Sequence, residues 1–199
     1  MNAMRTMPAG FADRVHDAQR AFRAALDALA RPGRPVPVAP AIAGVALGGA
    51  AAACLLALCD QDTAVWWQLD DGALAAWLCF HTDAPRTHAA REARFAVITR
   101  AAALPALASF NAGSAAAPEA SCTLLIEVPS FTSGPALEWR GPGIRDTQRV
   151  ALAGLPADFW SQWQANHAAF PQGVDVLFTC GEQLIGLPRT TRVRRLERI

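Results

Sequence analysis

The first regular pattern along the chain is helical. Apolar residues recur every three or four positions between residues 15 and 29, at Val15, Ala18, Phe22, Ala25, Leu26 and Leu29. Charged residues occupy the other faces, at Asp17, Arg20, Arg23 and Asp27. Because proline disfavours helix at the preceding residue, Arg31-Pro32-Gly33 ends the pattern. The spacing predicts an amphipathic helix.

A second, almost wholly apolar helix is predicted over roughly residues 48–59, and we expect it to be buried. The segment Pro35–Cys59 carries no charge, but only Ala50–Cys59 is continuously apolar, too short to cross about 30 Å of hydrocarbon. Met1–Gly10 is followed by charged residues rather than by the apolar stretch of a signal peptide. We therefore expect a soluble protein that does not interact with membranes.

Short apolar runs bounded by turn residues predict several strands. They are Ala64–Leu69, Arg94–Thr99, Cys122–Val128, Leu137–Arg140, Arg149–Leu152 and Val174–Thr179. Gln183–Leu187 and Thr191–Leu196 are predicted to pair with each other. Further helices are expected over Ala73–Leu78, Leu104–Phe110 and Pro156–Asn166, with Pro156 in the first turn of the last. The fold class is α/β: a single layered domain over residues 1–199, with a mixed β-sheet flanked by helices.

The amino-acid composition excludes several classes of protein and several kinds of catalysis. The 52% hydrophobic and 18% charged content excludes a disordered chain, and a net charge of +1 argues against nucleic-acid binding. All 18 basic residues are arginine, and the sequence has no lysine. Schiff-base catalysis, covalently held pyridoxal phosphate and a Walker-type phosphate loop are therefore excluded, because each needs the lysine amine.

Known motifs for metals and cofactors are absent from the local sequence. The five cysteines form no C-x-x-C pair, and apolar neighbours around Cys54, Cys59 and Cys122 predict buried, reduced thiols in a cytoplasmic protein. The four histidines show no metal-ligand spacing, so no metal is expected. Gly141-Pro142-Gly143 is too short for a dinucleotide fingerprint and is interpreted as a turn.

Four polar groups stand in apolar surroundings. Asp60-Gln61-Asp62-Thr63 suits a turn at a helix end, and Phe80-His81-Thr82 offers either a structural histidine or a ligand contact. Pro118-Glu119 either terminates a loop or faces a cleft. In Pro188-Arg189-Thr190-Thr191, a planar guanidinium beside two hydroxyls suits phosphate, phosphonate or carboxylate. Alternatively, Arg189 bridges to Asp175 inside the fold.

Two further groups have a structural interpretation. Helical spacing favours core positions for Trp160 and Trp163 over positions at an interaction surface. Arg192, Arg194, Arg195 and Arg198 suit a solvated strand edge better than a binding stripe, because edge strands are often protected by charge.

Several short segments, taken in order, resemble the PhnH family of bacterial carbon–phosphorus lyase components. They include Val15–Arg23, Phe80-His81-Thr82, Ala117-Pro118-Glu119, Gly141–Ile144, Phe170–Asp175 and Pro188–Thr191. The resemblance implies an α/β sheet partly similar to that of pyridoxal-phosphate-dependent transferases, without that cofactor. It also implies a homodimer that joins subunits G, I and J of a core complex. That complex transfers a phosphonate to ribose C1′ of ATP and releases adenine, and the later iron–sulfur radical step belongs to the J component.

The polar positions of the family correspond to His81, Thr82, Glu119, Asp175, Arg189, Thr190 and Thr191. We treat them as candidates for a pocket or an interface, with phosphonate or nucleotide as the anionic ligand, and the catalytic residues remain unknown. Gln172 and Trp66-Trp67 depart from the family pattern without touching these positions.

The resemblance favours an assembly subunit that is inactive alone and has no cofactor of its own. The alternative is a stand-alone anion- or nucleotide-binding protein or enzyme. It would use Arg189, Thr190 and Thr191, with His81 or Glu119 as proton-transfer group.

Overall fold

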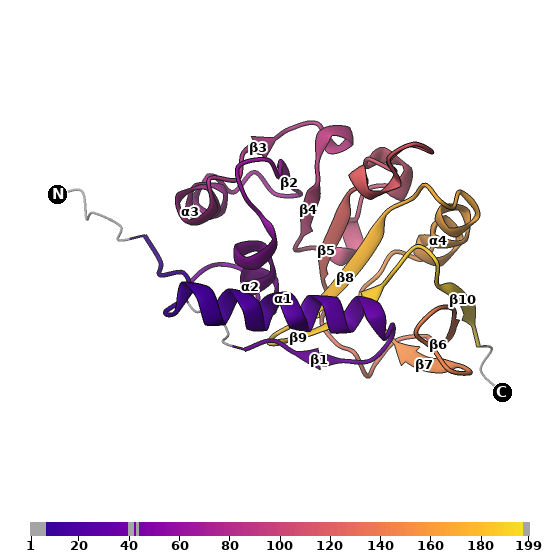
Figure 1. Ribbon diagram of the computed structural model, residues 1–199. Helices are drawn as coiled ribbons and strands as arrows, with labels where there is room; N and C mark the ends of the chain where they lie inside the picture. Colours follow the sequence, from indigo (N-terminus) through magenta and orange to yellow (C-terminus); the bar gives the residue numbers. More distant parts are fainter. Residues whose placement is uncertain (1–6, 40–41, 43, 197–199) are drawn as a thin grey trace.

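The computed structural model describes residues 7–39, 42 and 44–196, and its centre is a seven-stranded sheet. The strand order is β1-β9-β8-β5-β4-β2-β3 (Figure 1). These strands are β1 Val36–Pro37, β2 Val65–Trp67, β3 Arg86–Thr87, β4 Phe95–Ile98, β5 Thr123–Glu127, β8 Asp175–Cys180 and β9 Gln183–Leu187. A second, three-stranded sheet has the order β10-β6-β7, with β6 Ala136–Arg140, β7 Gln148–Ala151 and β10 Arg192–Arg195.

Strand direction makes the central sheet mixed. Strands β3, β2, β4, β5 and β8 run parallel, whereas β9 is antiparallel to both β8 and β1. Parallel strands covered on both faces read as continuous apolar runs, which is the pattern of β4 and β5. The structure thus confirms an α/β fold with a mixed sheet flanked by helices.

Within the described residues, four α-helices and four short 3₁₀ helices surround the sheets. The α-helices are α1 Arg14–Ala30, α2 Gly49–Leu58, α3 Gly72–Thr82 and α4 Phe159–Ala168. The 3₁₀ helices are η1 Ala90–Glu92, η2 Ala101–Ala103, η3 Leu107–Ser109 and η4 Pro118–Ala120. In Figure 1, α1 and α2 lie on one side of the central sheet, and α4 with the small sheet lies on the other.

Two hydrophobic clusters fill the space on either side of the central sheet. Because side chains alternate along a strand, Leu125 of β5 faces the cluster under α1 and α2, and its neighbour Ile126 faces the cluster under α4. Leu177 and Phe178 of β8 divide in the same way. Val97 and Ile98 of β4 do so too, and the three central parallel strands therefore carry the core on both faces.

The sequence pattern identified the buried face of helix α1 only in part, since Ala25 belongs to that face but most of the large apolar residues do not. The alanines Ala21, Ala24, Ala25 and Ala28 are buried, whereas Val15, Phe22 and Leu26 are 62%, 49% and 56% exposed. The physical reason is a close approach: a Cβ on Gly186 of β9 would lie 2.5 Å from the carbonyl of Ala28. Only small residues fit that side of the helix.

Asp17, assigned by the sequence pattern to a non-core face, is 2% exposed in the structure. Its carboxylate accepts a hydrogen bond from the Asp13 backbone N–H and pairs with Arg20. The Asp13 carboxylate accepts from the N–H groups of Val15 and His16 and so caps the helix. Asp17 is thus buried with its hydrogen bonds satisfied near the start of α1.

Three predicted elements need correction. No α-helix covers Leu104–Phe110, all of which the structure describes, because Pro105 holds Leu104 at ψ 128° and only the 3₁₀ turns η2 and η3 form. Helix α4 begins at Phe159, so Pro156 precedes the helix rather than lying in its first turn. Strand β10 pairs with β6 and not with β9, because the chain turns away from the sheet after Pro188.

Other expectations are confirmed. The remaining predicted strands are present with shifts of one or two residues, and α3 extends through Phe80-His81-Thr82. Cys54, Cys59 and Cys122 are buried free thiols, and Asp60–Thr63 and Gly141–Gly143 form turns. Trp163 is fully buried and Trp160 packs against the same core. Arg192, Arg194 and Arg195 are exposed, and Arg198 lies outside the described residues. No helix in the described part of the chain is long and apolar enough to cross a membrane.

Candidate functional site

Four of the seven predicted site residues line one shallow cavity of about 480 Å³. They are Glu119, Asp175, Arg189 and Thr190, and Phe170 and Pro171 lie beside them. Asp175 is the first residue of β8, and Thr123, the first residue of β5, lines the same cavity. The cluster therefore lies at the amino ends of the parallel strands, opposite the edge at which open α/β sheets usually bind ligands.

All three guanidinium nitrogens of Arg189 donate hydrogen bonds within the protein. Nε donates to both carboxylate oxygens of Asp175 at 3.2 Å, and Nη1 donates to the carbonyls of Pro118 at 3.0 Å and Pro171 at 3.2 Å. Nη2 donates to Ser121 Oγ and to the Asp175 carboxylate. The Arg189 side chain is only 11% exposed.

These contacts engage all five N–H donors that a guanidinium offers. The bridge to Asp175, which was one of the two sequence interpretations, is present. An anion could bind Arg189 only by displacing one of the internal bonds. In this structure the arginine ties three loops to the start of β8.

The two threonines after Arg189 differ in exposure. Thr190 is half-buried and lines the cavity, whereas Thr191 is fully buried, and its carbonyl accepts a hydrogen bond from Trp163 Nε1 at 2.9 Å. His167 Nδ1 lies 2.8 Å from the Arg189 carbonyl. The backbone of this segment is thus held by side chains of α4.

His81 and Thr82 are not part of this cluster. Both lie in the last turn of α3, at the opposite end of the molecule from α4 (Figure 1). His81 Nε2 lies 3.1 Å from the Pro8 carbonyl, and its ring meets Trp77 edge to face with centroids 5.5 Å apart. Thr82 Oγ1 donates to the Leu78 carbonyl at 2.8 Å. These contacts are those of structural residues at a helix end.

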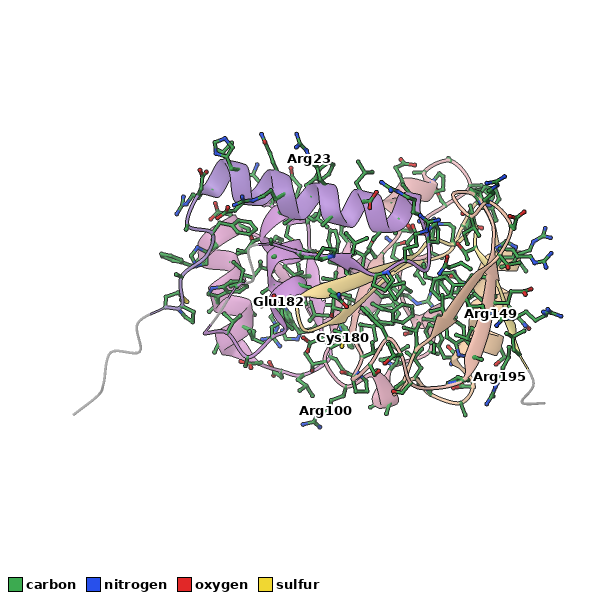
Figure 2. All side chains as sticks on the ribbon, turned by 90° about the horizontal axis from the view of Figure 1, so that it is seen from below. Arg23, Arg100, Arg149, Cys180, Glu182 and Arg195 are labelled. Carbon is green, nitrogen blue, oxygen red and sulfur yellow. The ribbon has the colours of Figure 1, made fainter. Side chains whose placement is uncertain are left out.

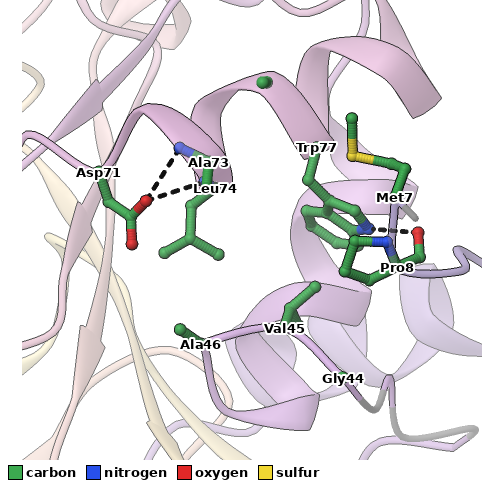
Figure 3. Close-up of a pocket in the computed structure, with 10 residues that line it drawn as sticks. Met7, Pro8, Gly44, Val45, Ala46, Asp71, Ala73, Leu74 and Trp77 are labelled. Carbon is green, nitrogen blue, oxygen red and sulfur yellow. Dashed lines mark hydrogen bonds between the residues drawn. The ribbon is translucent and has the colours of Figure 1, made fainter. Parts of the chain in front are cut away.

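A second cavity, of about 470 Å³, lies beside α3 (Figure 3). Met7, Pro8 and Trp77 form one side of it, and Trp77 Nε1 donates to the Pro8 carbonyl at 3.1 Å. Asp71 lies at the other side, where its carboxylate caps α3 by accepting from backbone N–H groups. The cavity is otherwise lined by small and apolar side chains.

Sequence reasoning missed Ser121 and His167, which hold Arg189 and its backbone. Ser121 directly precedes a predicted strand, and His167 follows a predicted helix, so neither position carried a signal beyond its location. Burial raises the pKa of the Cys54 and Cys122 thiols to about 12, which keeps them protonated and unreactive. Among the described residues, no group of three or more histidine, cysteine or acidic side chains could hold a metal ion.

The chain is thus a mixed α/β protein with a cluster of polar residues at one edge of its sheet. Arg189 holds this cluster together, and all of its guanidinium N–H groups are hydrogen-bonded within the protein. Residues 9–194 match the model of the family described as bacterial phosphonate metabolism protein (PhnH). The chain therefore belongs to the PhnH family, as the resemblance indicated.

Two curated relatives span almost the whole chain. The chain is 42% identical over 188 residues to the α-D-ribose 1-methylphosphonate 5-triphosphate synthase subunit PhnH of Rhizobium meliloti (strain 1021), covering 93% of this chain and 94% of the relative. It is 31% identical over 201 residues to the putative C-P lyase subunit protein HtxG of Stutzerimonas stutzeri, covering 96% and 94%.

Proposed function

We propose that the chain is a component of a bacterial carbon–phosphorus lyase assembly and fills the place of PhnH in a ribose 1-methylphosphonate 5-triphosphate synthase. In that assembly it joins subunits G, I and J in the cytoplasm. The assembly transfers a phosphonate to ribose C1′ of ATP and releases adenine. The observation that carries the proposal is 42% identity to the PhnH relative over nearly the full length of both chains.

The geometry supports a subunit that is inactive alone. Arg189 has no free donor to offer an anion, and His81 lies in a different part of the molecule. Of the two proton-transfer candidates in the rival enzyme hypothesis, only Glu119 shares a cavity with Arg189. A self-contained catalytic set of the kind that hypothesis needs is therefore not supported.

We further propose that the sheet is related to that of pyridoxal-phosphate-dependent transferases but works without the cofactor. The sequence contains no lysine, so no side-chain amine is present to form the internal Schiff base. ATP enters as substrate of the assembly, and the chain brings no cofactor of its own.

The exposed stripe of α1, made of Val15, Phe22 and Leu26, is the surface we propose for docking to a neighbouring subunit. Arg14 and Arg23 lie on the exposed sides of the same helix and form no ion pair within the described residues. Exposed apolar patches rimmed by polar residues mark interaction sites. The partner surface is expected to offer an apolar groove with carboxylates at its rim.

Co-expression with subunits G, I and J tests the proposal. The wild-type chain is expected to elute with them at fixed stoichiometry, and the isolated chain is expected to show no turnover of ATP with methylphosphonate. Failure to co-elute, or robust turnover by the isolated chain, would overturn the proposal.

Single substitutions test the proposed docking surface on α1 separately. Phe22→Asp should abolish co-elution while leaving the circular dichroism spectrum unchanged. Phe80, on α3, is also an exposed phenylalanine, and Phe80→Asp should leave co-elution intact. The isolated chain is expected to be a homodimer by light scattering. If Phe22→Asp breaks that homodimer but spares the assembly, the stripe is covered by a second copy and the docking proposal is wrong.

A further inference from the structure

The three strands of the small sheet, β10-β6-β7, are rich in arginine. Their charged residues are Arg140, Arg149, Arg192, Arg194, Arg195 and one carboxylate, Glu138. The whole chain, in contrast, has a net charge of only +1. Figure 2 shows Arg149 and Arg195 near each other at one end of the molecule, apart from Arg100. The small sheet is therefore a cationic surface on a nearly neutral chain.

Strand register places four of these arginines on one face of the small sheet. The side chains of the three strands that point into the core under α4 are Leu137, Trp139, Val150 and Val193. Because side chains alternate along a strand, their neighbours in the sequence point outwards. This outer face holds Glu138, Arg140, Arg149, Arg192 and Arg194. Arg194, Glu138 and Arg149 lie in register as one row, and Arg192 lies opposite Arg140 in the next.

One carboxylate serves this whole outer face. Glu138 Oε1 accepts hydrogen bonds from Arg140 Nε at 3.2 Å and from Arg194 Nη2 at 3.1 Å. Arg192 donates from Nε to His167 Nε2 at 3.3 Å, so its partner is an imidazole rather than a carboxylate. Like charges directly opposite each other on paired strands are destabilising, and Arg192 and Arg140 are such a pair. The outer face therefore has positive charge that the protein does not neutralise.

Most guanidinium donors on this face have no partner in the described part of the chain. Arg140 and Arg192 each donate only from Nε, and Arg149 forms no ion pair with any residue that the structure describes. The side chains of Arg140 and Arg194 are 63% and 70% exposed. Arg140 and Arg192 also line both of two adjoining shallow cavities, of about 350 Å³ and 630 Å³. Unlike Arg189, these arginines can bind an external anion without breaking internal hydrogen bonds.

Protection of a sheet edge explains only part of this arrangement. Strands β10 and β7 are the edges of the small sheet, and edge strands often carry charge that prevents unwanted pairing. Arg140, however, is on the central strand β6, which is already paired on both sides. Edge protection also does not require an arginine directly opposite another arginine. A shared anionic group between Arg140 and Arg192 would turn their repulsion into attraction.

The chemistry of the face favours carboxylates on a protein segment over a nucleic acid. Nucleic-acid binding normally needs a strongly basic chain, and single strands also need exposed aromatic side chains for stacking. The only aromatic residue of the three strands, Trp139, is fully buried. Alternate residues of an extended chain are about 6.7 Å apart, which is also the spacing of Arg192 and Arg194 along β10. Acidic residues at every second position could therefore lie opposite both arginines.

We propose that the outer face of the small sheet binds an extended acidic segment of a partner protein. One carboxylate of the segment lies between Arg192 and Arg140, and the carboxylate two residues along lies on Arg194. Arginine binds carboxylates with paired N–H donors, which suits such a contact. Binding at this face is separate from docking through α1 and does not depend on assembly with subunits G, I and J.

Fluorescence anisotropy of labelled synthetic peptides, titrated with the full chain at about 50 mM salt, tests the assignment. A short peptide in which glutamate and threonine alternate is expected to bind. A peptide of the same composition with its glutamates in one block should bind more weakly, and a peptide with glutamine in place of glutamate should not bind. Raising the salt to about 0.5 M should abolish binding, because exposed charges are then screened.

Arginine variants locate the contact. Arg140→Gln and Arg194→Gln should each weaken binding of the alternating peptide by about two- to fivefold, the range for a single exposed ion pair. The double variant R140Q/R192Q should weaken it by about tenfold. Arg100→Gln is the matched control, because Arg100 is also exposed but lies elsewhere on the molecule (Figure 2), and it should leave the affinity unchanged.

Four results would overturn the proposal. The alternating peptide might fail to bind at millimolar concentration of the chain, or Arg100→Gln might weaken binding as much as Arg140→Gln, which would mean a response to overall charge alone. Tighter binding of oligothymidylate than of the alternating peptide would assign the face to nucleic acid instead. A lowered melting temperature of Arg140→Gln with unchanged peptide affinity would mean that the arginines serve folding, whereas substitution of an exposed arginine should otherwise change the melting temperature little.

Discussion

Replacing Arg189 by methionine keeps the aliphatic stem of the side chain and removes every guanidinium donor. The Asp175 carboxylate then loses its counter-charge, and Ser121 Oγ and the carbonyls of Pro118 and Pro171 each lose a hydrogen bond. The side chains of Arg189 and Asp175 are 11% and 23% exposed, so neither group is freely hydrated. We expect Arg189→Met to fold but to be markedly less stable.

The expected loss follows from the burial of the pair. Removing one partner of a fully buried ion pair costs about 3–5 kcal/mol, and the partial exposure of Asp175 reduces that to about 2–4 kcal/mol. With a urea m-value of about 2 kcal/mol/M, the unfolding midpoint should fall by about 1–2 M. Tryptophan fluorescence reports the transition, because Trp163 is buried and hydrogen-bonded to the segment that follows Arg189.

Two further variants make the test specific. Arg195→Met removes an exposed arginine from β10 and should move the midpoint little. Asp175→Asn, combined with Arg189→Met in a double-mutant cycle, should show coupling, since the two side chains are in direct contact. The reasoning fails if Arg189→Met leaves the midpoint unchanged and instead abolishes binding of methylphosphonate or ATP, because Arg189 would then belong to a ligand site.

Three more predictions test packing, burial and thiol exposure. Gly186→Ala should cost about 1–3 kcal/mol in urea unfolding, because the new Cβ would lie 2.5 Å from the Ala28 carbonyl. Gly72→Ala, where the added Cβ meets nothing within 4 Å, should be neutral or stabilising, and equal losses would refute the argument. Glu127→Gln should gain stability relative to wild type as pH rises above about 4.5. The raised pKa means that the wild type loses stability while its carboxyl ionises, so parallel midpoints at pH 4 and pH 7 would contradict this. Cys79, which is exposed, should react with maleimide in the native protein, whereas the three buried thiols should react only after unfolding, as mass spectrometry would show.

The sequence was sufficient to predict the central strands for a physical reason. Strands covered on both faces need apolar side chains at every position, and Phe95–Ile98 and Thr123–Glu127 are nearly continuous runs of that kind. The two-residue edge strands β1 and β3 have no such pattern and were missed. The partner of β10 was wrong because strand pairing depends on where the chain goes after Pro188 and not on strand composition.

Prediction of the candidate site from the sequence was limited in the same way, because the contacts depend on how distant segments come together. The sequence offered Arg189 with Asp175 as one interpretation, but two of the six guanidinium hydrogen bonds go to backbone carbonyls, which side-chain patterns do not report. Thr99, Glu127 and Thr179 lie at the carboxyl ends of three neighbouring strands, and the sequence analysis did not connect them because they are far apart in the chain. Only the parallel register of β4, β5 and β8 brings them together.

Helix α1 has two apolar faces of different size, and this difference bears on the docking surface proposed above. Periodicity detects the large residues, yet close packing against β9 admits only alanines, so Val15, Phe22 and Leu26 are left at the surface. Full burial of such a side chain contributes about 1.5–3 kcal/mol, and these three are roughly half exposed, which leaves about 2–4 kcal/mol to be gained at an interface. That corresponds to roughly two orders of magnitude in affinity. The free energy that α1 leaves unused in its own fold is therefore large enough to help hold a subunit in a complex.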